Sequence, residues 1–410
     1  GLPLVVIEIP DSKSLVTSFW TKAGSRFDPE GKAGMAHFME HLLIKKTEEY
    51  PTDAKLAHVL EKVGAFKNGT TSRDWLNINI TSAAKDMELT TRILSEMIFR
   101  PLIEVKGFDA ERKVIFEEQA KQDTLPQELM WKLFTKVFFD PSQHKQPVVG
   151  TRESLETIKV NEAVNFWNTL ITSKDAILML AGGITINHAK IAAEKYFGTR
   201  TLKKSIFIPN YQYYSKEKVS FEKKLLPQTN FILGFRTFGG PPTQETYSLF
   251  VLRAILAGNW SSRIAQRLRV KESLIYSWRS QVQRLFDTGM FTLQLATANK
   301  NFQRAIFVLG EELVKLREKG ISQKELSLAK GYIEGSVVSG IETSWDYTDW
   351  YAYDELFWPE KVESVEERIA KVKKVTKENV DEVAKKYLTK ENWYLGIAGE
   401  VKEKEIKVEL

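Results

Sequence analysis

Two segments of this sequence resemble each other closely enough to constrain the fold of the whole chain. Residues 158–182 are IKVNEAVNFWNTLITSKDAILMLAG, and residues 375–399, which begin 217 positions later, are VTKENVDEVAKKYLTKENWYLGIAG. Each copy has a capped helical pattern, a short polar turn and an apolar strand that ends in Ala-Gly, and the copies have equal length. We infer an internal duplication in which each half of the chain forms an α/β domain of its own.

The duplication divides the 410 residues into two domains, within the two or three that this length suggests. We predict an N-terminal domain over residues 1–200, a linker over 201–217 and a homologous C-terminal domain over 218–410. The linker has charges, a proline and tyrosines but no helical periodicity. Strand and helix patterns are mixed, which predicts an α+β fold. Strands are expected in LVVIEIP, LVTSFWTKAG and TSRDWLNINIT, and helices from about Met35, over 52–63, over 84–98 and from Asp109 into the 120s.

Composition narrows the chemistry that the chain can perform. There is no cysteine, so disulfide bonds, thiolate ligands and a cysteine nucleophile are excluded, and any metal must be held by nitrogen and oxygen. The 59 basic and 53 acidic residues leave a charge of +6 without a concentrated basic block, so no nucleic-acid partner is expected. The longest apolar run, AILMLAGGI, is too short to cross a bilayer, so no membrane partner is expected. These features favour a cytoplasmic protein, although a removed leader would leave the same sequence.

The stretch AHFMEHLL, residues 36–43, places His37, Glu40 and His41 within five positions. Residues four apart on an α-helix lie one turn above each other, so both imidazoles can face one ion. A carboxylate beside that ion can accept a proton from water during attack on a carbonyl, which is the chemistry of metal-assisted hydrolysis. The alternative is a chance match on a solvated helix. The neighbouring residues are largely apolar, and an unpaired polar group is costly there, which favours the ligand role.

A catalytic zinc site usually has three protein ligands and leaves the fourth position to water. The helical stretch DAERKVIFEEQAKQD offers Glu111 and Glu118, which lie seven residues apart and therefore share a face. One of them can bind the metal while the other orients a histidine, and the spacing alone leaves both assignments open. Glu117 points elsewhere, about 100° around the helix.

With these residues in place, the sequence resembles the pitrilysin, insulin-degrading enzyme and mitochondrial processing peptidase family of inverted-motif zinc metallopeptidases, the inverzincins. The resemblance is to a short, two-domain, bacterial-type member, and it covers nearly the whole chain. KAGSRFDPEGKAGMAHFMEHLL, VGTRESLETI and LAGGITINHAKIAAEKYFG match successive landmarks. It implies one zinc ion per chain, held by His37, His41 and Glu118, which stands 77 residues after His41. It further implies that Glu40 is the general base and that Glu111 orients a histidine.

Two further elements extend the resemblance to substrate binding. SSRIAQRLRVKESLIYSW is similar to an arginine and tyrosine element of the family, which implies that Arg269 and Tyr276 contact the substrate backbone near the scissile bond. Without the resemblance, Arg269 would be interpreted as part of a basic helix and Tyr276 as a half-buried tyrosine of a strand. FKNGTTSRDW matches the edge strand that receives the substrate as an added β-strand, through Asn68, Gly69 and Thr70. The family more often has alanine after the asparagine, and Asn-Gly is also a hairpin-turn signal.

The resemblance also implies an assembly and a function. Each domain would be an antiparallel-rich sheet covered by helices, and the two would form half of a clam-shell chamber that a second chain closes. Because this chain carries both the metal motif and the Arg-Tyr element, we expect a homodimer, with a heterodimer as the alternative. The expected activity is that of a zinc-dependent endopeptidase on unfolded peptides or short protein segments. The alternatives are a processing-peptidase-type subunit of a heterodimer and a non-catalytic core or partner subunit of the same fold.

Other candidate features have simpler interpretations. His58, His144 and His188 have no carboxylate or histidine at ligand spacing, so they are expected to be structural. The aromatic segment TSWDYTDWYAYDELFW, residues 343–358, is expected to be a helix packed against a core, with carbohydrate stacking or an interface as the alternative.

Overall fold

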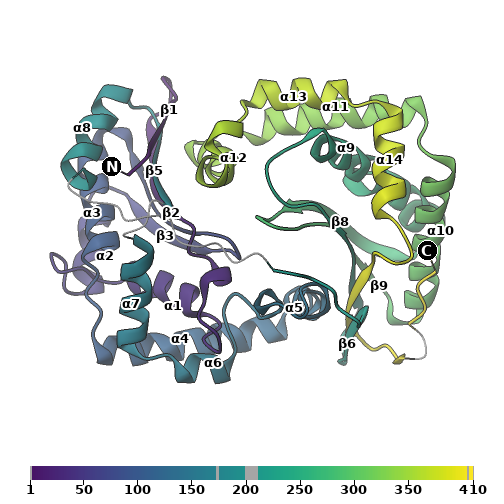
Figure 1. Cartoon of the computed structure of the whole chain (residues 1–410), viewed down its shortest axis with the longest axis horizontal. Helices are drawn as coiled ribbons and strands as arrows, with labels where there is room; N and C mark the ends of the chain where they lie inside the picture. The colour runs from purple at the N-terminus through teal and green to yellow at the C-terminus, as the bar shows by residue number, and fades with distance from the viewer. Residues whose placement is uncertain (1, 172–174, 199–210, 404–405, 410) are drawn as a thin grey trace. The chain divides into compact units, whose positions relative to one another are not determined.

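The computed structural model describes residues 2–171, 175–198, 211–403 and 406–409. Within them the chain forms two compact units, each built around one five-stranded sheet (Figure 1). Unit 1 combines Gly1–Gln119, Gln146–Pro209 and Ile341–Val362, and unit 2 combines Ala120–Lys145, Asn210–Gly340 and Glu363–Leu410. The predicted α+β class, with two antiparallel-rich sheets covered by helices, is confirmed.

The sheet of unit 1 has the strand order β1-β5-β2-β4-β3, in which only the β1–β5 pair is parallel. Its strands are β1 (Leu4–Glu8), β2 (Ser14–Thr21), β3 (Phe66–Thr71), β4 (Leu76–Ala83) and β5 (Ala176–Gly182). Its helices are α1 (Met35–Leu43), α2 (Asp53–Glu61), α3 (Met87–Phe99), α4 (Val105–Thr124), α6 (Arg152–Thr157), α7 (Val160–Ile171), α8 (Ile186–Phe197) and α12 (Ser344–Phe357). Strand β3 therefore lies at an edge of the sheet.

Unit 2 repeats this order as β6-β10-β7-β9-β8, again with one parallel pair, β6–β10. Its strands are β6 (Val219–Lys223), β7 (Thr229–Thr237), β8 (Ile275–Arg284), β9 (Gly289–Thr297) and β10 (Tyr394–Gly399). Its helices are α5 (Pro126–Phe138), α9 (Gln244–Arg253), α10 (Phe302–Lys319), α11 (Gln323–Gly340), α13 (Val365–Lys374) and α14 (Lys377–Tyr387), with π-helical segments η4 (Ala254–Gly258) and η5 (Ala265–Lys271).

The two duplicated segments occupy equivalent places in the two sheets. The first forms α7 and β5, and the second forms α14 and β10. Each of these strands is parallel to the first strand of its unit and antiparallel to the second. Residues 172–174 of the first polar turn lie outside the described residues. The two segments thus have equal lengths because each forms the equivalent helix and strand of its unit.

Each unit takes one helix from the other half of the sequence. Helix α5 packs on β10, β7 and β6, and α12 packs on β5 and β2. The docking of α5 depends on glycine: a Cβ at Gly396 would lie 2.5 Å from the backbone nitrogen of Phe134, and one at Gly234 would lie 2.4 Å from its ring. The predicted boundaries of 1–200 and 218–410 separate the two sheets, whereas the compact units also exchange these helices. Residues 201–210 of the predicted linker lie outside the described residues.

Helix α12 is the aromatic segment of the sequence. The side chains that it buries completely are mostly small or polar, including Ser344, Thr348 and Ala352. Trp345 is half-buried and stacks on Trp20 of β2, with ring centroids 6.3 Å apart. The expected helix on a core is found: Phe357 is buried, whereas its other aromatic side chains are at most partly buried.

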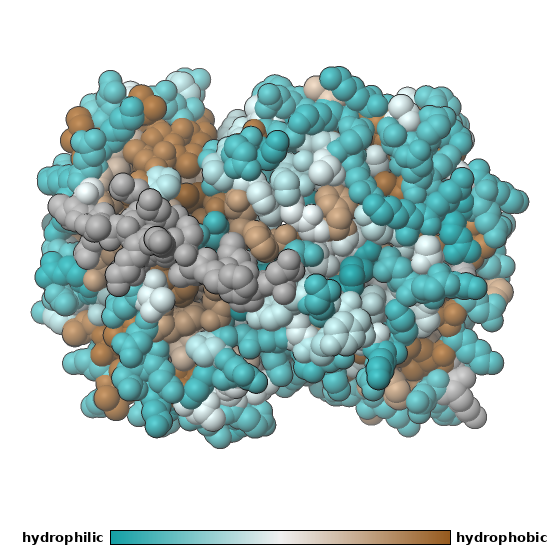
Figure 2. Space-filling model, in the orientation of Figure 1, coloured by the Kyte–Doolittle hydropathy of each residue, from teal (hydrophilic) through white to brown (hydrophobic). Residues whose placement is uncertain are grey.

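Hydrophilic residues cover most of the visible face of unit 2, whereas hydrophobic residues gather on the upper part of unit 1 (Figure 2). The buried apolar side chains form a core on each sheet, around Phe19 and Leu180 in unit 1 and around Phe231 and Leu293 in unit 2. No described helix is both long and apolar enough to cross a bilayer.

Candidate metal centre

Helix α1 carries His37, Glu40 and His41, and its N-terminus is anchored by an aspartate. The helix begins after Gly34, whose φ of 92° is in the left-handed region that glycine adopts readily. The carboxylate of Asp28 accepts the N–H groups of Gly34 and Ala36 at 2.7 and 2.8 Å. These are groups for which a helix start offers no internal acceptor. Asp28 therefore fixes where the motif helix begins.

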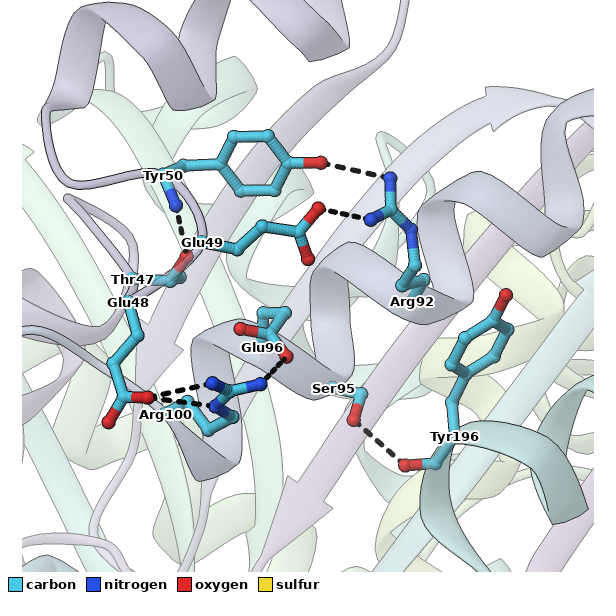
Figure 3. Close-up of polar contacts among 9 residues, drawn as sticks. All are labelled: Thr47, Glu48, Glu49, Tyr50, Arg92, Ser95, Glu96, Arg100 and Tyr196. Atoms are coloured by element: carbon cyan, nitrogen blue, oxygen red, sulfur yellow. Dashed lines mark hydrogen bonds and ion pairs between the residues drawn. The ribbon is translucent and has the colours of Figure 1, made fainter.

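The loop after α1 is tied to α3 by a set of polar contacts (Figure 3). Arg100 donates two hydrogen bonds to Glu48, at 2.8 and 3.0 Å, and one to Glu96 at 3.2 Å. Arg92 contacts Glu49 and donates to the hydroxyl of Tyr50 at 2.9 Å. These contacts link the loop that follows α1 to α3.

Helix α4 brings the acidic residues to the motif helix. Phe38 of α1 stacks on Phe108 of α4 with ring centroids 4.3 Å apart, and both are fully buried. The guanidinium of Arg112 lies 5.1 Å from the centre of the Phe108 ring and donates to the carbonyl of Ile158 at 2.7 Å. This packing sets the rotation of α4, so that Glu111 and Glu118 face α1 while Glu117 is exposed to solvent.

Three donor atoms converge between the two helices. The Nε2 atoms of His37 and His41 lie 3.7 and 3.5 Å from Oε2 of Glu118, and ligand atoms of the three residues all lie within 4.8 Å of one another. These distances are long for hydrogen bonds, but they suit ligands of one tetrahedral ion, whose donor atoms are roughly 3.3–3.5 Å apart. The residues present therefore fit a metal ion held by two imidazoles and one carboxylate.

The second carboxylate of α4 orients one of these imidazoles. Oε1 of Glu111 lies 2.8 Å from Nδ1 of His41, which leaves Nε2 directed at Glu118. Lys45 lies 3.4 Å from the other oxygen of Glu111. Burial acts to raise the pKa of Glu111, but the bonds to His41 and Lys45 outweigh it and lower the pKa, so this carboxylate is ionised. An ionised carboxylate behind a ligand histidine fixes its tautomer and increases its basicity.

The two histidines have different electrostatic surroundings. Burial lowers the pKa of His37 to about 4, so its imidazole is neutral near pH 7. Burial also acts to lower the pKa of His41, but the hydrogen bond to Glu111 and the nearby carboxylate of Glu118 outweigh it and raise the pKa to about 9. Without a metal, His41 therefore carries a proton between two carboxylates. A bound cation would replace that proton, because metal ligands must be deprotonated.

Glu40 lies beside the three ligands and faces the edge strand β3. Its side chain is buried, and Oε2 accepts a hydrogen bond of 2.6 Å from the hydroxyl of Thr71. Burial raises the pKa of Glu40, which makes its carboxylate a better proton acceptor. A Cβ at Gly69 would lie 2.5 Å from Cγ of Glu40. Glycine at this position, where the family more often has alanine, therefore leaves room for Glu40 in this conformation.

The predicted edge residues Asn68, Gly69 and Thr70 all lie inside β3. The Asn-Gly pair is thus part of a strand, and the turn that follows is formed by later residues. Among the described strands, β3 pairs with β4 alone, so its other side can accept an added strand through main-chain hydrogen bonds.

Arg269 and Tyr276 lie in unit 2. Arg269 is in η5, and its Nη1 donates to the carbonyl of Ile275 at 3.1 Å. Tyr276 occupies a β-bulge at the start of β8 and is 53% exposed, in contrast to the half-buried tyrosine that a regular strand predicts. β8 is the edge strand of its sheet, as β3 is in unit 1. Arg269 and Tyr276 thus lie on either side of the short connection between η5 and β8.

The sequence-based interpretation missed two residues that shape the site. Thr71 binds Glu40, and strand alternation places it on the same face as Gly69, which was a usable signal. Asp28 lies seven residues before α1, and only the fold shows that it reaches the helix N-terminus. Among the remaining histidines, His58 and His188 are exposed, while His144 is buried against Tyr213 in unit 2.

Family models match most of the chain. The model described as Insulinase (Peptidase family M16) matches residues 4–152, and that described as Peptidase M16 inactive domain matches residues 157–332. The chain belongs to the M16 peptidase family. The resemblance indicated by the sequence motifs is confirmed, and the candidate metal centre of this M16 protein lies within the first matched segment.

Relatives of this M16 protein align over almost its full length. An uncharacterized zinc protease of Mycobacterium leprae is 26% identical over 95% of this chain and 88% of its own length, and one of Bacillus subtilis is 25% identical over 95% and 94%. Two crystal structures share the fold. They are a protease from Helicobacter pylori (TM-score 0.86, 19% identity, 97% of both chains) and a peptidase M16 inactive domain from Pseudomonas fluorescens (TM-score 0.88, 16% identity, 100% of this chain and 97% of that one).

Proposed function

We propose that this M16 protein is a zinc-dependent endopeptidase. The observation that carries the proposal is the convergence of His37, His41 and Glu118 beside the buried carboxylate of Glu40. The names of the relatives, which are zinc proteases, support zinc as the metal. His37, His41 and Glu118 would hold the zinc ion, which would lower the pKa of a bound water and polarise the substrate carbonyl.

The residues of the chain supply the remaining chemistry. Glu40 accepts a proton from the attacking water and delivers it to the amine that leaves when the peptide bond breaks. The hydroxyl of Thr71 holds one oxygen of Glu40, so the other is available for this transfer. Glu111 keeps His41 oriented towards the metal position. Each group is placed by helix or strand backbone, which is the rigidity that a catalytic arrangement needs.

The open edge of β3 favours an extended peptide as the substrate. A peptide added to this edge runs past Gly69, and therefore past Glu40, with its carbonyl groups in the plane of the sheet. Such pairing requires several residues of the substrate to be unfolded. We therefore propose unfolded peptides or short protein segments, cut at internal bonds, as the substrate class.

The central test compares the wild-type protein with Glu40→Gln. Peptide hydrolysis should fall by roughly 10²–10⁴-fold, because the proton acceptor is lost, while one zinc ion per chain is retained. Glu117→Gln on the exposed face of α4 is the matched control and should keep both the wild-type rate of peptide hydrolysis and the bound zinc ion. Hydrolysis by Glu40→Gln at the wild-type rate would rule out the proposed mechanism.

We also propose a homodimer in which Arg269 and Tyr276 of one chain support the substrate held by the metal centre of the other. The proposal rests on the presence of both elements in one chain and on the exposure of Tyr276. A mixture of Glu40→Gln and Arg269→Ala chains tests it. Activity restored above that of either variant supports completion between chains, whereas no restoration excludes it. A protein that is active only with an unlike partner would favour the heterodimer.

A further inference from the structure

A groove of about 470 Å³ lies in unit 1, on the face of the sheet opposite Glu40. Strand alternation defines the two faces of β3: Gly69 and Thr71 lie against Glu40, whereas Phe66 and Asn68 face the other way. Cross-strand pairing places Phe66 opposite Thr81, and Asn68 opposite Asn79. We call this the Asn68 groove. Its lining includes Phe66, Asn68, Asn79, Thr81, Ser344 and Trp345.

The end of α12 completes the Asn68 groove. Ser344 lies 3.0 Å from the hydroxyl of Ser14 at the start of β2, and Trp345 stacks on Trp20. These contacts attach the first turn of α12 firmly to the sheet. The groove is therefore a fixed feature of unit 1 and depends on the helix that this unit takes from the second half of the sequence.

The lining is aromatic and polar but uncharged. Phe66 is 61% exposed, which is unusual for a phenylalanine. Within the described part of the chain, the amide of Asn68 and the hydroxyl of Thr81 make no side-chain hydrogen bond. No lining residue is charged. The groove thus offers ring surfaces for packing and free polar groups at its wall, but no partner for a charge.

We propose that the Asn68 groove holds one uncharged side chain of the peptide substrate, with tyrosine favoured. The proposal rests on the proposed peptidase function, because it places the substrate on the edge of β3. Phe66 and Trp345 give an aromatic ring apolar contacts, and Asn68 or Thr81 can bind its hydroxyl. An aspartate or lysine would lose hydration there without gaining an opposite charge.

Strand geometry fixes which substrate residue this is. Successive side chains of an added strand point to opposite faces of the sheet. The substrate residue beside Gly69 lies next to Glu40, and the residue beside Phe66 lies three positions further along. The groove therefore selects a side chain about three residues from the bond that is cut, and it makes an uncharged aromatic residue there a determinant of specificity.

The test uses an uncharged peptide in which tyrosine, leucine, aspartate or lysine is moved stepwise around the cleaved bond. Cleavage is followed as kcat/KM, and binding is measured by fluorescence anisotropy with the Glu40→Gln protein. At one position about three residues from the bond, tyrosine should exceed aspartate and lysine by on the order of ten-fold in both measurements. Phe66→Asp should improve the lysine peptide about ten-fold at that position only, and Trp345→Ala should lower the tyrosine preference by a similar factor.

Ile191→Asp is the matched control, because Ile191 of α8 is 65% exposed and does not line the groove. It should leave the preferences unchanged. Cleavage without a position that rejects charge, or a preference that Phe66→Asp does not alter, overturns the groove proposal while the peptidase proposal stands. Selective binding without cleavage by the zinc-loaded wild-type protein supports the groove and overturns the peptidase proposal. Absence of both binding and cleavage counts against both.

Discussion

The two units share one architecture but differ in the helix that follows their second strand. In unit 1 this helix is α1, which buries His37 and Glu40. In unit 2 the helix at the same place in the order is α9, which buries mainly Tyr247, Leu249, Val251 and Leu252. The fold is therefore stable with an apolar helix at this position. The imidazoles and carboxylates of unit 1 cost desolvation energy that packing does not require, as expected if they bind the proposed metal ion.

A second pair of equivalent helices, α4 and α11, shows the same contrast. By order along the chain, α4 of unit 1 corresponds to α11 of unit 2. Glu111 of α4 binds His41, whereas Glu325 of α11 binds the guanidinium of Arg263 through two hydrogen bonds of 2.6 and 3.0 Å. One carboxylate binds a histidine of the candidate metal centre, and the other forms an ion pair. One framework thus supports a candidate reaction site in one unit and a structural contact in the other.

The largest expected effect concerns what the units share, the exchange of α5 and α12. Residues 1–200 expressed alone would carry α5 without the sheet that covers Phe134 and Phe138, and would lack α12. Exposure of the apolar face of α5, at about 1.5–3 kcal/mol for each large side chain, approaches the whole stability of a typical domain, about 5–15 kcal/mol. We expect this fragment to be insoluble or unfolded, as judged by circular dichroism and gel filtration.

Co-expression provides the control for the fragment experiment. Residues 1–200 and 211–410 produced together should assemble into a soluble complex, because each then supplies the helix that the other lacks. A monomeric 1–200 fragment with a cooperative thermal transition would show that the exchanged helices are dispensable. The two halves of the chain would then be independent domains.

The second effect concerns the difference between α4 and α11. Glu111→Gln should weaken zinc binding about 10–100-fold, because His41 loses the carboxylate that fixes its orientation. Competition with a chelator of known affinity measures this change. Glu325→Gln in unit 2 is the matched control and should bind zinc as the wild type does. Equal zinc affinities for the two variants would mean that the carboxylates of α4 and α11 have the same structural role.

The smallest effect concerns the stability that Glu325 contributes to unit 2. Burial acts to raise the pKa of Glu325, but the hydrogen bonds from Arg263 and Ser322 lower it to about 2. Since the pKa in the folded state is below the unfolded value, the contribution is complete above about pH 4.5 and is lost as the pH falls towards 2. Glu325→Gln should lower the free energy of unfolding by about 1 kcal/mol at pH 7.

Denaturant titrations at pH 7 and pH 3 measure this pH dependence. The difference in the free energy of unfolding between Glu325→Gln and the wild type should be smaller at pH 3 than at pH 7. Glu334→Gln, which breaks the more exposed contact with Lys373, is the control and should change less. A difference that grows at pH 3 would contradict the assignment of an ion pair to Glu325.

Much of this fold could be predicted from the sequence, because the signals are local or repeated. The duplicated segments indicated two equivalent domains, and the alternation in TSRDWLNINIT indicated the strand that the structure shows as β4. The exchange of α5 and α12 could not be predicted in this way. Helix α5 is an amphipathic pattern like any other, and the space left by Gly234 and Gly396 for Phe134 exists only once distant strands are paired.

Part of the candidate site, too, could be predicted from the sequence, and part could not. Helical spacing was enough to place His37 and His41 on one face, and it allowed either Glu111 or Glu118 as the third ligand. The choice depends on the rotation of α4, which is set by the stacking of Phe38 on Phe108. The structure directs Glu118 to both Nε2 atoms and Glu111 to Nδ1 of His41. Contacts between α1 and α4, which are far apart in the sequence, thus decide which of the two glutamates faces both imidazoles.

The most direct test of this metal centre is calorimetric titration of metal-free protein with zinc for the wild type, Glu118→Gln and Glu117→Gln. The two altered residues are neighbours on α4, but Glu118 faces the imidazoles and Glu117 faces solvent. We expect one zinc ion per chain for the wild type and Glu117→Gln, and an affinity more than about 100-fold weaker for Glu118→Gln. Wild-type affinity in Glu118→Gln would contradict the account.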